Sequence, residues 1–350
     1  LKPGSPGQLE ESGNRVRILG IETSCDETSV SVVEDGTGIL SNVTATQDEF
    51  HQKYAGVVPE IASRRHHQTI NYVIEQSLHA AGVDFRDLDA VAVTAYPGLI
   101  GSLLIGVTAA KTLSFSLGIP LLGVNHIEAH LYSVQFENQV RHPLIGLIVS
   151  GGHTLLLRSD GVGQYEILGS TLDDAAGEAF DKVSKHLGLG YPGGPAIERA
   201  AGHGDERAYD FPRVTLNGGR DRYNFSYSGL KNAVINQRER FRRKQGAGEA
   251  ADVAASFQAA ATDVLLTKVR WACRDSGINR VALAGGVANN TRLRELFTAD
   301  ETIQVYLPSR QLTTDNAAMV AGLAYYKLSR GEKSGLDLEP HSRLAGLTRG

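Results

Sequence analysis

The sequence predicts an α/β protein of two similar lobes, and three observations support this fold class. With 350 residues, the chain is long enough to bury two separate cores. Short apolar runs typical of buried strands alternate with segments whose apolar residues recur at helical spacing. A strand, a polar turn and a second strand open residues 16–34, and the same order returns at 144–158. This repetition indicates a duplication.

The first lobe is expected to span residues 16–143. Its predicted strands are 16–22, 29–34, 38–46, 90–95 and 121–124. Pro59 suits the first turn of a helix that ends near Gly82, and a second helix runs from 98–102 to Leu117. The polar residues Arg64, Arg65, His66 and His67 are expected to form a solvated face of the first helix.

The second lobe is expected to span residues 144–331, with an insertion around 190–250. Its predicted strands are 144–149, 154–158, 165–168, 281–284 and 303–307, and its predicted helices are 174–188, 251–276 and 317–329. Residues 205–228 are polar and irregular. The basic cluster at 237–244 fits an exposed helix face as well as an RNA contact.

Charge, cysteine content and hydropathy indicate which kind of protein this is. The 35 basic and 39 acidic residues give a net charge of -4, so nucleic-acid binding would need a local patch. Two cysteines, Cys25 and Cys273, favour a reducing compartment over a disulfide framework. No apolar run is expected to approach a membrane span, so we predict a cytoplasmic protein. Residues 1–15 are expected to be a disordered extension and residues 332–350 a tail.

The clearest chemical motif is Asn125-His126-Ile127-Glu128-Ala129-His130. Four residues make about one helical turn, so both imidazoles lie on one face and suit one metal ion. Spacing alone leaves a structural pair of histidines equally open. The zinc-protease pattern H-E-x-x-H needs its glutamate directly after the first histidine, where this chain has Ile127. The protease interpretation therefore fails on geometry.

Several turns between predicted strands are rich in small and polar residues. Thr23–Thr28 and Gly285–Asn290 would each place backbone amides at the end of a strand, where they can bind a ligand. Thr23–Thr28 also suits a plain hairpin loop, and Ser150–His153 is expected to be a tight turn. Tyr191–Pro195 is expected to be a rigid turn. From local sequence alone, Asp315 is best explained as the N-cap of the last long helix.

Taken together, an ordered set of motifs resembles the TsaD family, once called the Gcp family or O-sialoglycoprotein endopeptidase. The resemblance covers residues 16 to about 328 and is close to the bacterial form. It rests on residues 20–28 (GIETSCDET), 125–130 (NHIEAH), 149–153 (VSGGH), 173–182 (DDAAGEAFDK), 191–195 (YPGGP), 225–231 (FSYSGLK), 284–287 (AGGV) and 314–316 (TDN).

The resemblance implies a duplicated two-lobe actin/hexokinase-like ATPase fold with a central nucleotide cleft. It implies N6-L-threonylcarbamoyladenine synthase activity: an acyltransferase moves threonylcarbamoyl from threonylcarbamoyl-AMP to N6 of the adenosine beside the anticodon. The tRNA substrates read codons that begin with A. A TsaB-like paralogue and a TsaE-like ATPase are the expected partners, and no membrane is involved.

Residue by residue, the resemblance makes His126, His130 and Asp315 ligands of one divalent metal ion. Fe²⁺ is the first choice, with Zn²⁺ and Mg²⁺ as alternatives. The implied adenylate contacts are Ile148, Val149, Ser150, Gly151, Gly152, Asp181, Gly194 and Asn290. We place Asp26 and Glu27 on the corresponding first-lobe loop as candidates for taking the proton from the amine.

Three rival functions remain open at this point. A metallopeptidase is disfavoured by the position of Glu128. A phosphotransferase or ATPase of the same fold would release ADP, since a fold does not fix its chemistry. A non-catalytic scaffold paralogue would lack the set of metal ligands.

Overall fold

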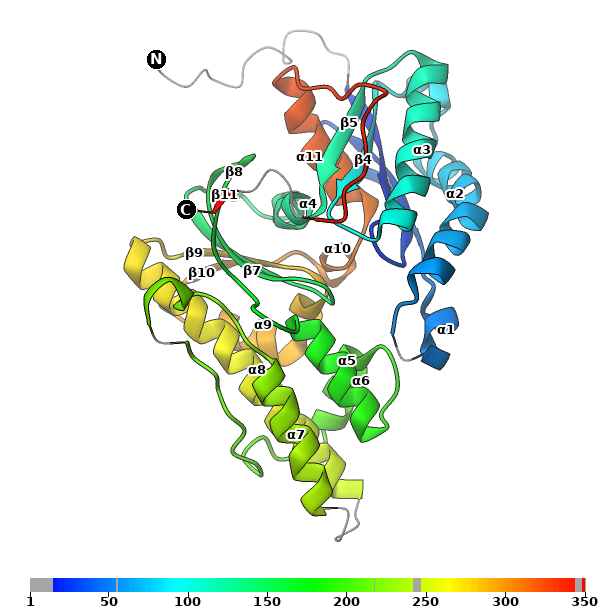
Figure 1. The fold of residues 1–350 in the computed structure, drawn as a ribbon. Coiled ribbons are helices and arrows are strands. Elements are labelled where there is room, and N and C mark those ends of the chain that lie inside the picture. Colours follow the sequence, from blue (N-terminus) through cyan, green and yellow to red (C-terminus); the bar gives the residue numbers. More distant parts are fainter. Residues whose placement is uncertain (1–14, 55, 217, 242–246, 344–347, 350) are drawn as a thin grey trace. The chain divides into compact units, whose positions relative to one another are not determined.

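Two mixed β-sheets, one in each of two units, organise this computed structural model (Figure 1). The structure describes residues 15–54, 56–216, 218–241, 247–343 and 348–349. Within these, unit 1 contains residues 15–47, 57–136 and 315–343, and unit 2 contains the remainder. Each unit is described by itself below.

The sheet of unit 1 has five strands in the described part of the chain. They are β1 (Arg17–Glu22), β2 (Thr28–Glu34), β3 (Gly38–Ala45), β4 (Ala90–Tyr96) and β5 (Leu121–Asn125), and their order is β3-β2-β1-β4-β5. β1 pairs antiparallel with β2 and parallel with β4. The carboxyl ends of β1, β4 and β5 therefore meet at one edge of the sheet.

Helices cover both faces of this sheet. Leu19 and Ile21 face α2 (Pro59–Ala81) and α3 (Ile100–Leu117), with which they share a buried core. Successive strand residues point to opposite faces, so Gly20 points the other way. A Cβ at Gly20 would clash with α11 (Ala317–Ser329), which lies against this second face (Figure 1). The glycine allows α11 to pack directly on β1.

The sheet of unit 2 repeats the pattern of the first. Its described strands are β6 (Leu144–Val149), β7 (Thr154–Gly161), β8 (Gln164–Ser170), β9 (Arg280–Ala284), β10 (Gln304–Tyr306) and β11 (Thr348–Arg349). The order β8-β7-β6-β9-β10 matches β3-β2-β1-β4-β5, with the same antiparallel and parallel pairings. This shared topology confirms the predicted duplication.

Helices of unit 2 bury the apolar side chains of β6. The core joins Ile145, Leu147 and Val149 to Phe180 and Phe257, whose rings meet edge to face with centroids 5.0 Å apart. The described helices of this unit are α1 (Asp48–His51), α5 (Ala176–Leu187), α6 (Gly193–Ala201), α7 (Ser228–Phe241), α8 (Ala247–Ser276), α9 (Thr291–Thr298) and α10 (Arg310–Thr313).

Most predicted elements are present, and two expectations about local structure need correction. The predicted rigid turn Tyr191–Pro195 is partly helical, because α6 already begins at Gly193. His66 is buried rather than part of a solvated face. Residues 1–14 of the predicted extension lie outside the described residues, whereas Arg15 pairs with Glu34 at 2.8 Å. The basic cluster at 237–244 also lies outside the residues whose side chains are described.

Helix α3 corrects a third expectation, that no apolar run approaches a membrane span. Its 18 residues are long and apolar enough to cross a membrane by length and composition alone. The only charged residue in this helix is Lys111. In the structure α3 packs against α2 and β4, and it buries Leu103, Val107 and Ala110.

Candidate functional site

The two histidines of the predicted metal motif lie on α4 (His126–Tyr132), which follows β5 directly. Asn125 caps this helix: its side-chain oxygen accepts the Ile127 N–H at 2.8 Å and the Glu128 N–H at 3.4 Å. Because the helix begins at His126, His130 lies one turn later on the same face. Both side chains are buried, and their ring centroids are 4.5 Å apart.

Asp315 lies beside both histidines, although 185 positions separate it from His130. Its Oδ1 is 3.0 Å from Nε2 of His130 and 3.6 Å from Nε2 of His126. The N-cap of α11 is Asn316, whose side chain accepts the Met319 N–H at 3.2 Å. The interpretation of Asp315 as a helix cap is therefore wrong, and its carboxylate faces the imidazoles.

The donor set fits a metal ion. One ligand atom from each of His126, His130 and Asp315 lies within 4.8 Å of the others. Both histidines direct Nε2 toward the same carboxylate oxygen, as expected of imidazoles that share one ion. Among the described residues, Nδ1 of buried His130 has no hydrogen-bond partner. Imidazole nitrogen and carboxylate oxygen together suit a transition metal.

A buried carboxylate lies behind His126. Nδ1 of His126 is 3.0 Å from Oε2 of Glu22, which ends β1. Burial alone would lower the pKa of His126, but the Glu22 carboxylate, and then Asp315, raise it to about 9. Burial alone would raise the pKa of Glu22, but His126 brings it below its ordinary value. The sequence interpretation missed Glu22, although an acid at the end of an apolar strand is an unusual residue type for a core.

The loop between β1 and β2 carries Asp26 and Glu27 and is fixed at several points. The Leu99 N–H donates to the Ser24 carbonyl at 2.8 Å, and Thr23 Oγ1 donates to the Ser102 carbonyl at 2.9 Å. Ser24 Oγ also lies 3.2 Å from Nδ1 of His126. The loop therefore adjoins the three predicted metal ligands within unit 1.

His66 of α2 holds the other side of this loop. Its Nε2 lies 2.9 Å from the Cys25 carbonyl, and its Nδ1 lies 2.8 Å from Oγ1 of Thr28. Burial, and then the Asp26 carboxylate, raise the pKa of the Cys25 thiol well above its ordinary value. Cys25 is thus no thiolate nucleophile at neutral pH.

In unit 2, the turn after β6 meets two further segments. The Ser150 N–H donates to the His153 carbonyl at 2.8 Å, and the Gly177 N–H donates to the Ser150 carbonyl at 3.2 Å. Gly285, at φ 91°, packs so tightly on Val149 that a Cβ would clash with its backbone. Ile148 and Val149 are fully buried in β6, which leaves Gly151 and Gly152 as the exposed positions of this turn.

The remaining predicted contact residues of unit 2 lie around α6. Asp181 Oδ1 accepts the Gly193 N–H at 2.7 Å, beside Gly194. Asn290 donates from its side-chain nitrogen to Gln258 at 2.7 Å and to Glu198 of α6 at 3.4 Å. Its oxygen accepts the Leu293 N–H at 3.0 Å, so Asn290 also caps α9.

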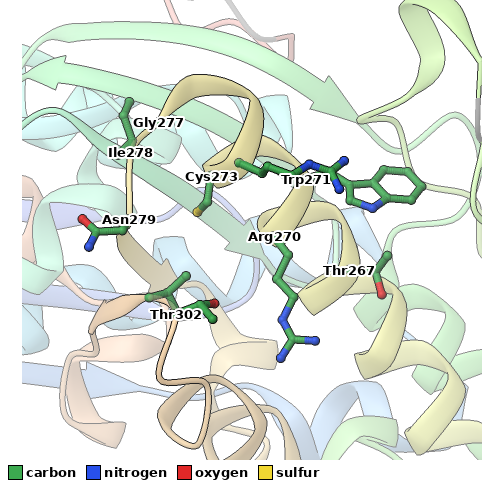
Figure 2. Close-up of a pocket in the computed structure, with 10 residues that line it drawn as sticks. Thr267, Arg270, Trp271, Cys273, Gly277, Ile278, Asn279 and Thr302 are labelled. Atoms are coloured by element: carbon green, nitrogen blue, oxygen red, sulfur yellow. The ribbon is translucent and has the colours of Figure 1, made fainter.

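A surface pocket of about 590 Å³ lies elsewhere in unit 2 (Figure 2). It is lined by the end of α8, including Arg270, Trp271 and Arg274, and by Asn279 just before β9. The predicted substrate turn follows the opposite end of β9. Arg270 pairs with Asp300 at 2.6 Å and Arg274 with Asp275 at 3.4 Å, so carboxylates already neutralise both guanidinium groups.

A family model and the similar proteins of known sequence carry the same description. A family model described as tRNA N6-adenosine threonylcarbamoyltransferase matches residues 38–322. Proteins of that name from Caldicellulosiruptor saccharolyticus and Treponema denticola are 48% and 46% identical to this chain. The alignments cover 91% and 95% of this chain, and 94% and 99% of those proteins.

A solved structure supports the fold. HypF of T. kodakarensis matches 91% of this chain and 48% of its own length, with a TM-score of 0.61 and 15% identity. At this identity, the likeness concerns the fold alone, and it agrees with the two-lobe α/β fold that the family resemblance implies.

Proposed function

The chain belongs to the TsaD family of tRNA N6-adenosine threonylcarbamoyltransferases, and from this membership we propose how its residues carry the reaction. The enzyme transfers a threonylcarbamoyl group to N6 of adenosine in tRNA. An adenine amine is a weak nucleophile. The protein must therefore bind an activated acyl donor, orient the amine and remove its proton.

We propose that His126, His130 and Asp315 hold the one metal ion of the enzyme. The observation that carries this proposal is the meeting of Nε2 of both histidines at the Asp315 carboxylate. Two imidazoles and one carboxylate are the ligand set typical of non-haem Fe²⁺ sites, so we propose Fe²⁺, with Zn²⁺ and Mg²⁺ as alternatives. When bound, the ion would polarise the carbamoyl carbonyl and neutralise charge on the leaving AMP.

We propose threonylcarbamoyl-AMP as the donor, bound by the loops of unit 2. The Ser150 N–H already donates to His153, so the phosphate contacts fall to the amides of Gly151 and Gly152. A Cβ at either glycine would meet nothing within 4 Å, so open space surrounds them. Asp181, Gly194 and Asn290 would complete the contacts together with the backbone of Ile148 and Val149.

We infer that Asp26 or Glu27 takes the proton released by the adenosine amine. Asp26 is largely buried, and the hydrogen bonds around Ser24, Cys25 and Thr28 hold its loop in place. These contacts keep the loop in one conformation, which supports the role of one of its carboxylates as a general base.

We also propose that the enzyme works in the cytoplasm with a TsaB-like paralogue and a TsaE-like ATPase. Exposed large apolar side chains support docking of a protein partner on unit 1. Tyr72 of α2 is 63% exposed, and Ile100, Leu104 and Phe115 of the adjacent α3 are 49%, 48% and 75% exposed. Ile100, Leu104 and Phe115 recur at helical spacing on one face of α3, and an exposed apolar face of this kind suits a protein partner.

Mass analysis of tRNA nucleosides tests this proposal. The full chain is incubated with tRNA, threonylcarbamoyl-AMP and the two partner proteins. We expect modified adenosine from the wild type and from His79→Ala, which changes an exposed histidine of α2, and none from His126→Ala. Full activity of His126→Ala would contradict the metal assignment. In a separate assay the chain is given ATP without either partner protein. Release of ADP there, with no modified adenosine in the full mixture, would favour the phosphotransferase alternative.

A further inference from the structure

Glu22 is a fully buried carboxylate with three hydrogen-bond partners. Oε1 accepts the Ser24 N–H at 2.6 Å, and Oε2 accepts the Thr94 hydroxyl at 2.6 Å. Nδ1 of His126 lies 3.0 Å from the same Oε2. An unpaired buried carboxylate would cost several kcal/mol, on the order of the penalty for burying an ion, so these partners stabilise it.

The contact with Glu22 determines which nitrogen of His126 carries hydrogen. An ionised carboxylate only accepts hydrogen bonds, so Nδ1 must be the donor. The other nitrogen, Nε2, then has a lone pair when the ring is neutral, and it lies 3.6 Å from Oδ1 of Asp315. The tautomer that Glu22 selects is the one that a metal ion at Asp315 and His130 requires.

We propose that Glu22 is a positioning residue of the metal site, which fixes the ring and the tautomer of His126 so that Nε2 binds the ion. This inference rests on the metal site proposed above. Glu22 is not one of the three proposed ligands. It acts through His126, as carboxylates behind metal-binding histidines do in general.

The substitution Glu22→Gln distinguishes this role from simple hydrogen bonding. Glutamine has one accepting oxygen and one donating nitrogen. If the oxygen keeps the Ser24 N–H, the amide nitrogen faces Nδ1 of His126 and favours a ring that accepts there. Ser24 Oγ, 3.2 Å from Nδ1, is then the acceptor left for a hydrogen on Nδ1. Hydrogen on Nε2 instead would block the metal. If the amide is reversed, its nitrogen opposes the Ser24 N–H and displaces the loop.

Titration of the metal-free full-length protein with Co²⁺, followed by its visible absorption, tests the proposal. We expect the dissociation constant of Glu22→Gln to rise about 10- to 100-fold, with a changed spectrum. Glu128→Gln is the matched control, because it removes a carboxylate from the same helix without a contact to His126. We expect this control to change the constant less than about threefold, because Glu128 is neither a proposed ligand nor a hydrogen-bond partner of the His126 ring.

Three other outcomes of this titration would overturn the proposal. Unchanged affinity and spectrum in Glu22→Gln would overturn the positioning role while leaving the metal site intact. Equal losses in both variants would also overturn it, because loss of charge alone would then explain the effect. If the wild type bound no Co²⁺, or if His126→Ala bound it as tightly as the wild type, both the metal site and this inference would be overturned.

A second measurement does not depend on how a variant folds. In wild-type protein with ¹⁵N-labelled histidine and bound Zn²⁺, nitrogen chemical shifts report the tautomer of each ring. We expect hydrogen on Nδ1 and metal on Nε2 of His126. The reverse arrangement would overturn the proposal.

Discussion

His66 shows how one buried side chain fixes a loop that sequence patterns leave undefined. Both ring nitrogens are used, one with the Cys25 carbonyl and one with the Thr28 hydroxyl. Its neighbours on α2, Arg64 and His67, are exposed. The sequence shows four polar residues in a row, and only the position of α2 against the loop decides which of them points inward.

We expect His66→Ala to destabilise the fold and slow the reaction. The loss of two buried hydrogen bonds and the resulting cavity should lower the free energy of unfolding by about 2–4 kcal/mol. A displaced Asp26 and Glu27 should also slow tRNA modification about tenfold or more. Urea unfolding and nucleoside analysis measure the two effects. His67→Ala is the control, and similar behaviour of both variants would contradict this role of His66.

Lys268 is a second residue whose role the sequence hides. It is fully buried on α8, and its ammonium group donates to the carbonyls of Leu216 and Arg222. It also lies 4.7 Å from the ring centre of Trp271. Burial, and then Arg222, lower the pKa of Lys268 from 10.5 to about 8. Lys268 therefore holds the irregular segment after residue 205 through two hydrogen bonds, although its own pKa is lowered.

The pKa of Lys268 predicts how stability depends on pH. Between pH 8 and 10.5, the unfolded chain keeps a proton that the folded chain has released, so stability rises with pH. We expect the wild type to gain free energy of unfolding relative to Lys268→Met as the pH rises through 8. Urea unfolding of both proteins across this range measures the difference. A constant difference would show that the pKa is unchanged by folding.

At the scale of elements, glycines decide how closely helices approach the loop after β1. A Cβ at Gly98 would lie 2.6 Å from the carbonyl oxygen of Ser24 and 2.8 Å from its Cβ. The chain before α3 can therefore pass the loop only without a side chain at this position. The same Ser24 accepts the Leu99 N–H, so the close approach and the hydrogen bond support each other.

We expect Gly98→Ala to lower the free energy of unfolding by about 1–3 kcal/mol, because the added methyl group forces Ser24 or α3 to move. Gly202→Ala is the control, since a Cβ there has ordinary contacts, 3.5 Å or more from its nearest neighbours. Thermal unfolding of both variants gives the comparison. Equal stabilities would show that the loop adapts without cost.

Helix ends were predictable where a single residue decides them. α2 and α5 end at Gly82 and Gly188, both in the left-handed conformation, as expected. Local sequence failed where two neighbours compete: Asp315 and Asn316 both suit an N-cap, and only Asn316 takes the position. It also failed at α6, where two glycines in Tyr191–Pro195 favoured a turn although a helix begins there.

At the scale of the molecule, the repeated strand order accounts for the placement of the site loops. Topology puts the β1–β2 turn and the β6–β7 turn at equivalent positions of two sheets, as the repeated sequence pattern predicted. The meeting of Asp315 with the histidines could not be derived from spacing, because 185 positions separate Asp315 from His130. It depends on α11, which follows β10 of the second sheet in sequence but packs on the first sheet.

Because the three proposed ligands come from distant parts of the sequence, we expect metal binding to stabilise the folded protein. The ion proposed for α4 and Asp315 would bind the folded state only, so metal at about 100 times its dissociation constant should add about 2.7 kcal/mol to the free energy of unfolding. We expect the thermal midpoint to rise with added metal in the wild type and not in Asp315→Ala. Equal shifts in both proteins would place the ion elsewhere.

The most direct test of the central claim is anomalous X-ray scattering at the iron edge from crystals of the iron-loaded enzyme. We predict one strong peak about 2.0–2.2 Å from Nε2 of His126, Nε2 of His130 and a carboxylate oxygen of Asp315, the usual range for such ligands. A strong peak at other residues, with no peak among these three, would contradict the proposed metal centre.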